Sequence, residues 1–129
     1  MLFPFVSEQG VAMRKRYWGI LAAVVVVLGA GGGVGTAVIQ VARLAGARVI
    51  AVTSTPERCA AVAELGADLV IDRLAGSWSR AAWLATERRG ADVIVENVGA
   101  ATWRDSLRTA ARGGRIVTYG ATSGATPET

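Results

Sequence analysis

The chain reads VVVVLGAGGGVGT over residues 24–36. Val24–Leu28 is a continuous apolar run dominated by valine, which is typical of a strand covered by helices on both faces. After the glycines, residues 36–45 carry apolar side chains at helical spacing, and Gly46 follows as the predicted C-cap. The stretch therefore predicts a strand, a glycine-rich turn and a helix in direct succession.

The same alternation recurs along the rest of the chain. Short apolar runs predict further strands at residues 48–52, 69–71, 93–95 and 115–119. The helices between them are predicted to begin at Thr55, Ser77 and Thr102 and to end at Gly66, Gly90 and Gly113. This alternation predicts the α/β class: a doubly wound, Rossmann-like parallel sheet of about five strands in the order 3-2-1-4-5.

Two of the helix starts carry specific capping patterns. Thr55 offers a hydroxyl cap and is followed by Pro56 at the first helical position. Thr102 is followed three residues later by Asp105, which resembles a capping box with Asp in place of Glu. We therefore expect both threonine side chains to cap their helices.

Composition excludes several classes of site. The 129 residues suit one domain, and 52% hydrophobic against 19% charged residues indicates a folded chain. The chain has no histidine and one cysteine, Cys59, so a histidine triad, an internal disulfide and a zinc site are not expected. Arg14, Lys15 and Arg16 supply most of the net charge of +4, so nucleic-acid binding is not supported either.

The glycine-rich turn has the spacing of a dinucleotide site. Gly29, Gly32 and Gly35 fit a GxxGxxG pattern between the predicted strand and helix. Gly32 would let the backbone approach a pyrophosphate, and Gly35 would let the helix pack on the strand. The N–H groups from Gly33 to Thr36 would offer the positive end of the helix to phosphates. Alternatively, these glycines form only a flexible turn or a helix-packing face within a membrane.

The end of the second predicted strand favours NADP(H) over NAD(H). An NAD site usually places an acidic residue there, but this chain has Thr53 and Ser54, followed by Arg58. Small hydroxyl side chains leave room for a 2′-phosphate, with which Arg58 could pair. Alternatively, these residues only form a turn and cap, with Arg58 in solvent. The loop Glu96-Asn97-Val98-Gly99, at the end of the fourth predicted strand, faces the point where the strand order reverses and could border the nicotinamide ribose. Alternatively, Glu96 and Asn97 only cap the strand end.

The N-terminal part allows a second interpretation of the chain. We expect an irregular segment at residues 1–23, the NADP-binding domain at 24–125 and a tail at 126–129. The uncharged run from Tyr17 to Ala42 exceeds the roughly 20 residues that cross a bilayer, so a membrane-anchored or exported remnant is the alternative. The many glycines of this run weaken a helix, so we expect no membrane span and a cytoplasmic location.

Five stretches together resemble a known family. They are residues 27–35, 65–68, 92–99, 102–103 and 113–120. Across about Val24 to Ala125 the chain resembles the cofactor-binding domain of the medium-chain dehydrogenases/reductases, with the quinone-oxidoreductase-like branch of the zinc-binding-type alcohol dehydrogenases as the best match.

The resemblance implies an NADPH-dependent oxidoreductase that transfers hydride to or from a quinone, an enone or an alcohol. It assigns Gly32, Gly33 and Val34 to the pyrophosphate, Ser54 and Arg58 to the 2′-phosphate, Asn97 and Val98 to the ribose, and Gly120 and Ala121 to the nicotinamide. Arg73 stands where the family often has a tyrosine. No zinc site is expected in this chain.

The resemblance also implies a missing partner. Family members carry an N-terminal catalytic domain that residues 1–23 do not resemble, so we expect a truncated or stand-alone domain with little turnover by itself. We expect one of two partners: a separate catalytic chain, or a second copy of this chain bound through the exposed sheet edge after Tyr119. A nucleotide-sensing module using the same pocket is the remaining alternative.

Overall fold

The computed structural model describes residues 11–13 and 23–124 and contains one six-stranded sheet. The strand order is β1-β4-β3-β2-β5-β6. The strands are β1 (Val11–Met13), β2 (Val24–Leu28), β3 (Arg48–Thr53), β4 (Leu69–Asp72), β5 (Ala91–Glu96) and β6 (Ala110–Thr118). Strands β2 to β6 are parallel, which confirms the predicted doubly wound order. Strand β1 pairs antiparallel with β4, an addition that the expected irregular segment at residues 1–23 did not include.

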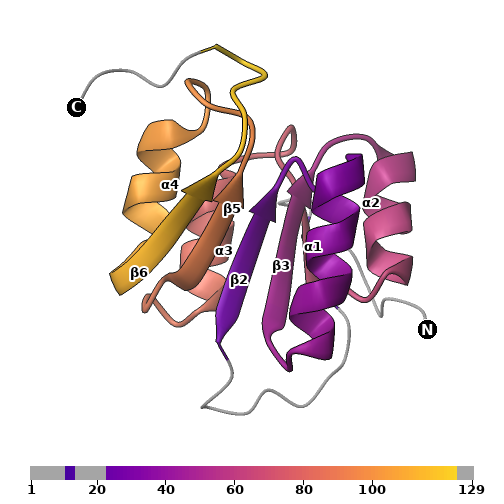
Figure 1. Ribbon diagram of the computed structural model, residues 1–129, viewed down its shortest axis with the longest axis horizontal. Coiled ribbons are helices and arrows are strands. Elements are labelled where there is room, and N and C mark those ends of the chain that lie inside the picture. The colour runs from indigo at the N-terminus through magenta and orange to yellow at the C-terminus, as the bar shows by residue number, and fades with distance from the viewer. Residues whose placement is uncertain (1–10, 14–22, 125–129) are drawn as a thin grey trace.

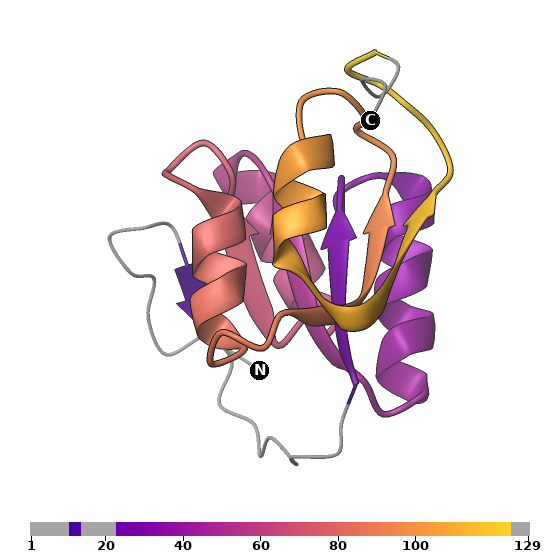
Figure 2. The ribbon, with the colours of Figure 1, turned by 90° about the vertical axis from the view of Figure 1, so that its left-hand side faces the viewer.

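Four helices cover the two faces of the sheet. They are α1 (Gly33–Leu44), α2 (Pro56–Glu64), α3 (Trp78–Ala85) and α4 (Trp103–Thr109). Helices α1 and α2 lie on one face, and α3 and α4 lie on the other (Figure 1). Figure 2 shows α3 and α4 side by side in front of the sheet. The arrangement is the three-layer sandwich expected of alternating strands and helices.

Strand β2 supplies side chains to both layers of the core. Val24, Val26 and Leu28 pack in the cluster that contains Trp78 of α3, whereas Val25 and Val27 pack in the cluster that contains Ile39 of α1. All five β2 side chains are buried. Successive side chains of a strand point to opposite faces, so a continuous valine run serves both layers.

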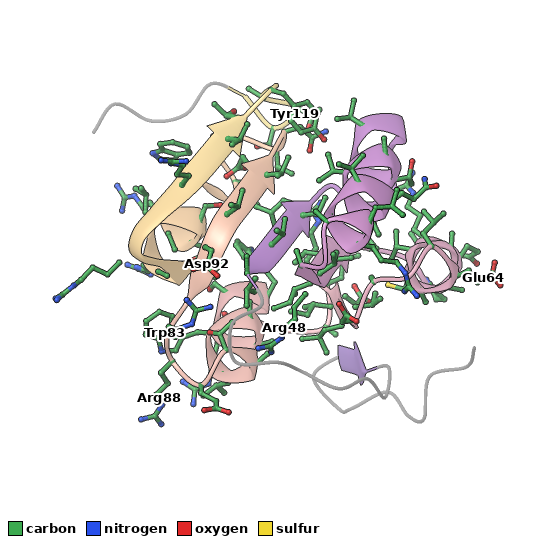
Figure 3. The ribbon with its side chains drawn as sticks, turned by 60° about the horizontal axis from the view of Figure 1, so that its bottom comes forward. Arg48, Glu64, Trp83, Arg88, Asp92 and Tyr119 are labelled. Atoms are coloured by element: carbon green, nitrogen blue, oxygen red, sulfur yellow. The ribbon has the colours of Figure 1, made fainter. Side chains whose placement is uncertain are left out.

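A repeated Gly-Ala-Asp sequence fixes the start of two strands. Gly66 and Gly90 have positive φ angles of +108° and +89°, and each is followed by a fully buried alanine. Asp68 Oδ2 accepts the N–H of Val49 in β3 at 2.8 Å, and Asp92 Oδ2 accepts the N–H of Val24 in β2 at 2.8 Å. Each carboxylate therefore ties its own strand to the neighbouring one. Figure 3 looks towards this end of the sheet, where Asp92 lies.

Three local predictions were wrong. Helix α4 ends at Thr109 rather than Gly113, because β6 begins at Ala110 and Gly113 adopts its positive φ of +78° inside an irregular strand. Helix α3 ends at Ala85, and the chain then turns before Gly90. Thr102 does not cap α4 with its side chain, because its hydroxyl donates to Glu96 instead.

The other predicted caps are confirmed. Thr55 Oγ1 accepts the Arg58 N–H at 3.3 Å, with Pro56 at the start of α2. Ser77 Oγ accepts the Arg80 N–H at 3.2 Å at the start of α3. These hydroxyls satisfy N–H groups that a helix start leaves unpaired.

The continuous helical span from Tyr17 to Ala42 is wrong. Val24–Leu28 is a central strand of the sheet and α1 begins only at Gly33, so no single helix runs through this stretch. Residues 17–22 lie outside the described part of the chain. Within that part, no helix has both the length and the hydropathy needed to cross a membrane.

The first prediction concerns the Asp92 carboxylate. Hydrogen bonds from Arg89, at 2.8 and 2.9 Å, lower the pKa of Asp92 to about 2, and the Val24 N–H acts in the same direction. A depressed pKa adds stability above the unfolded-state pKa near 4, and this stability is lost as the pH falls from about 4 to about 2. With the pair partly exposed, we expect Asp92→Asn to cost about 1 kcal/mol at pH 7 and progressively less below pH 4.

Urea unfolding of both proteins at pH 7, 4 and 3 measures this difference. Asp105→Asn is the matched control, because its partner Arg108 lies 3.8 Å away and both side chains are more exposed. We expect the control to lose less stability at pH 7. An Asp92→Asn loss that stays constant down to pH 3 would contradict the linkage.

Candidate functional site

A cavity of about 350 Å³ lies at the carboxyl ends of the parallel strands. Its lining consists of Gly29, Gly31, Gly32, Val52, Thr53, Ser54, Arg58, Arg73, Asn97, Val98 and Thr122. Gly29, Gly31 and Gly32 follow the central strand β2. Val52, Thr53, Ser54, Arg58 and Arg73 end or follow β3 and β4, and Asn97, Val98 and Thr122 come from the β5 side. Because β2 lies between β3 and β5, the cavity has a glycine floor and two polar flanks.

The floor depends on close backbone approach. Gly29 has a positive φ of +64°, and a β-carbon there would collide with Asn97 Oδ1. A β-carbon on Gly35 would lie 2.7 Å from the Gly29 carbonyl oxygen and 2.8 Å from the Ala30 Cα. Helix α1 therefore packs directly on the turn, as predicted for Gly35, and only glycine permits this approach.

The first turn of α1 faces this floor with unsatisfied donors. Gly32 is the N-cap, and α1 has neither a side-chain cap nor an acidic residue in its first turn. The Thr36 N–H already donates to the Gly32 oxygen at 2.9 Å. The N–H groups of Gly33, Val34 and Gly35 precede the first helical hydrogen bond, so they are free to bind an anion.

Two arginines approach from the flank formed by β3 and β4. Arg58 lies in the first turn of α2, and a β-carbon on Gly31 would lie 3.0 Å from its Cδ. Arg73 follows β4, and its N–H donates to the Thr53 oxygen at 2.9 Å. Thr53 is buried and Ser54 half-buried at the end of β3. The lining of this cavity contains no carboxylate, so the flank is positively charged.

The opposite flank is formed by Asn97, Val98 and Thr122. Asn97 Oδ1 is buried and has no hydrogen-bond partner in the described part of the chain. Buried acceptors are almost always paired, so this unpaired oxygen, in a residue that lines the cavity, is a candidate acceptor for a ligand donor. Thr122 reaches this flank because its N–H donates to the Asn97 oxygen at 2.9 Å.

The structure brings most of the predicted site residues together. The cavity lining includes Gly29, Gly32, Thr53, Ser54, Arg58, Asn97 and Val98, while Gly33, Val34 and Gly35 form the adjoining helix turn.

Gly120 and Ala121 are not among the residues that line this cavity, although a β-carbon on Gly120 would lie 3.6 Å from the Cβ of Asn97, which does line it. Their contact with the nicotinamide stays a prediction. The segment after β6 crosses the loop after β5 and presents Thr122 instead, held by hydrogen bonds of Thr122 and Ser123 to Asn97 and Val98.

The predicted site did not include four lining residues: Gly31, Val52, Arg73 and Thr122. Of these, Arg73 stands at the position of a family tyrosine, but no contact was predicted for it. Arg73 could have been found, because it directly follows the third parallel strand just as Ser54 follows the second. Parallel strands end at one edge of the sheet, so residues after neighbouring strands converge there.

Other candidate chemistry is limited. Burial, followed by the nearby Asp72, raises the pKa of the half-buried Cys59 thiol, which disfavours the reactive thiolate. Across residues 11–13 and 23–124, no three His, Cys, Asp or Glu side chains are grouped so that they could hold a metal ion.

Comparison with known proteins identifies the family. A family profile described as zinc-binding dehydrogenase matches residues 33–129. Acryloyl-coenzyme A reductase of Metallosphaera sedula is 38% identical over 96 residues, which cover 74% of this chain and 27% of that protein. Crotonyl-CoA reductase of Streptomyces collinus is 30% identical over an alignment 136 positions long, which covers 92% of this chain and 29% of that protein.

Solved structures give the same result. A quinone oxidoreductase of Pseudomonas syringae has a TM-score of 0.80 at 30% identity, covering 84% of this chain and 33% of that one. The quinone oxidoreductase of Escherichia coli, solved with NADPH, has a TM-score of 0.78 at 28% identity, covering 83% and 33%. The chain spans about a quarter to a third of the length of these relatives.

The match covers most of the chain, and the strand order, the glycine floor and the helix start agree with the predicted resemblance. The chain therefore belongs to the zinc-binding dehydrogenase family and has the Rossmann-like fold of the medium-chain dehydrogenase/reductase superfamily.

Proposed function

We propose that the chain binds NADP(H) in this cavity, in preference to NAD(H), and forms the cofactor half of a reductase. The observation that carries the proposal is the flank in which Arg58 and Arg73 meet Thr53 and Ser54, with no carboxylate in the lining. An acidic residue at this strand end would hold the 2′-hydroxyl of NAD and repel a 2′-phosphate. Two guanidinium groups beside small hydroxyl side chains favour the phosphate.

The rest of the cavity suits the remaining parts of the cofactor. The pyrophosphate would lie over Gly31 and Gly32, where the N–H groups of α1 offer hydrogen bonds. Asn97 Oδ1 would accept a ribose hydroxyl and so gain the partner it lacks in the described part of the chain. Val98 would add apolar contact beside it. When bound, the cofactor supplies or accepts a hydride.

The names of the relatives support two substrate classes. Reductases of acryloyl-CoA and crotonyl-CoA, together with quinone oxidoreductases, support a conjugated carbonyl compound such as an enone, an enoyl thioester or a quinone. Alcohol dehydrogenases among the similar solved structures support an alcohol as the second class. Hydride transfer needs the substrate about 3–3.5 Å from the nicotinamide. We expect little turnover from the chain alone, because the described lining is accounted for by the cofactor.

The outer edge of the sheet is a candidate contact for a second copy of the chain. Strand β6 ends the strand order beside β5, and Val117 and Tyr119 are 48% and 39% exposed near its end. Unpaired backbone groups at a sheet edge readily pair with another strand. We propose edge-to-edge pairing of two β6 strands.

We predict that Arg58→Ala weakens NADPH binding about tenfold, which corresponds to about 1.4 kcal/mol, and leaves NADH binding nearly unchanged. Isothermal titration calorimetry with each dinucleotide measures the two affinities. Arg80→Ala, an exposed arginine on α3, is the control and should change neither. Equal losses for both dinucleotides in the Arg58 variant would reject the 2′-phosphate assignment.

Gly35→Val should abolish binding of both dinucleotides, because its β-carbon would force α1 away from Gly29 and Ala30. We also expect overpacking to cost about 1–3 kcal/mol of stability. Gly76→Val is the matched control, since a β-carbon there meets no atom within 4 Å. Fluorescence titration with NADPH and thermal melting test both variants, and unchanged binding by Gly35→Val would refute the proposed floor.

The β6 contact predicts a dimer in solution. Val117→Lys places a charge beside the proposed pairing and should shift the mass towards the monomer, as measured by light scattering after size-exclusion chromatography. Leu84→Lys, at a similarly exposed position on α3, should leave the mass unchanged. A parent chain that already elutes as a monomer would argue against the contact.

A further inference from the structure

Glu96 is a fully buried carboxylate, and it directly precedes Asn97, which lines the cavity. It is the last residue of β5 and is 0% exposed, and it does not itself line the cavity. A buried carboxylate is costly unless hydrogen bonds satisfy its oxygens. Its role therefore depends on which groups satisfy it.

Three donors surround the Glu96 carboxylate. The N–H of Gly99 donates to Oε1 at 2.9 Å, and the Thr102 hydroxyl donates to the same oxygen. The Ser106 hydroxyl donates to Oε2 at 2.7 Å. The donors extend from the loop after β5 into α4, so one side chain joins the strand, the loop and the helix.

The bond to Gly99 closes a short loop that contains only Asn97 and Val98 between its ends. These are the two residues of the loop after β5 that line the cavity. The loop is also held from its other side, where Thr122 and Ser123 donate to the Asn97 and Val98 oxygens at 2.9 and 2.7 Å. The position of the Asn97 side chain therefore depends on the carboxylate behind it.

We propose that Glu96 is a positioning residue, which holds Asn97 and Val98 in the geometry that the ribose and nicotinamide half of the dinucleotide requires. The inference rests on the proposed dinucleotide site. Glu96 acts on one half of the ligand only, because Ser54, Arg58 and Arg73 belong to the opposite flank and make none of the hydrogen bonds to its carboxylate.

Two ligands separate this role from a general contribution to folding. NADPH contacts both flanks, whereas adenosine 2′,5′-bisphosphate would reach only the arginine flank and the glycine floor. Glu96→Leu keeps a side chain of similar size but removes the acceptor of the Gly99 N–H and the Ser106 hydroxyl, while the Thr102 hydroxyl keeps only its bond to the Gly99 oxygen at 3.3 Å. We expect it to weaken NADPH binding at least tenfold and to change bisphosphate binding by less than twofold, as measured by isothermal titration calorimetry.

Glu96→Gln is the conservative rescue. Its amide oxygen can still accept from Gly99 and Thr102, and its amide nitrogen can donate to the Ser106 oxygen, which also accepts. We expect NADPH affinity within about threefold of the parent chain. If Glu96→Leu fails to fold, Thr102→Val and Ser106→Ala replace it. Thr102→Val removes a donor to the oxygen that holds the loop, so it should weaken NADPH more than Ser106→Ala does.

The outcomes are distinct. Selective loss of NADPH affinity with rescue by glutamine supports the positioning role. Equal losses for both ligands, or no loss in Glu96→Leu, would overturn it while leaving the cofactor site intact. In the replacement pair, equal effects of the two variants would also overturn it. A parent chain that binds neither ligand would overturn the proposed function itself and this inference with it.

Discussion

The approach of α1 to the turn after β2 sets the geometry of the whole cavity. At Gly35 the helix lies so close to Gly29 and Ala30 that a β-carbon would be 2.7 Å from the Gly29 oxygen. This contact fixes where α1 begins, and so directs its first N–H groups across the end of the central strand. The positive φ of Gly29 completes the reversal. Both flanks of the cavity are placed relative to this turn.

The two ends of the sheet are built differently. At the amino ends of the strands, Asp68 and Asp92 accept backbone N–H groups from neighbouring strands, which locks the register where no cavity is needed. At the carboxyl ends, the backbone is held by glycine turns and by Glu96, and side chains remain available to a ligand. The division agrees with the general rule that open α/β sheets bind ligands at the carboxyl ends of their strands.

Local sequence patterns allowed most of the fold to be predicted. The errors arise where contacts with residues distant in sequence determine the local structure. The valine run, the glycine turn and the Thr55 and Ser77 caps depend on residues close in sequence. Thr102 fits a capping pattern, but its hydroxyl donates to the buried Glu96. Gly113 indicates a positive φ, which serves a helix end and an irregular strand equally well. The pairing of β1 with β4, and the arrival of Thr122 at the cavity, depend on contacts between distant segments.

The residues of the two flanks differ in how precisely they must be positioned. Arg58 is exposed, and a charge that attracts a phosphate works at a distance and tolerates motion of its side chain. Hydride transfer tolerates little motion, because a misplacement of about 1 Å can cost about 100-fold in rate. The flank that would border the reacting half is accordingly tied to the backbone by Glu96 from behind and by the segment after β6 from above. In the proposed site, affinity for the dinucleotide and orientation of its reacting end would thus be supplied by separate parts of one cavity.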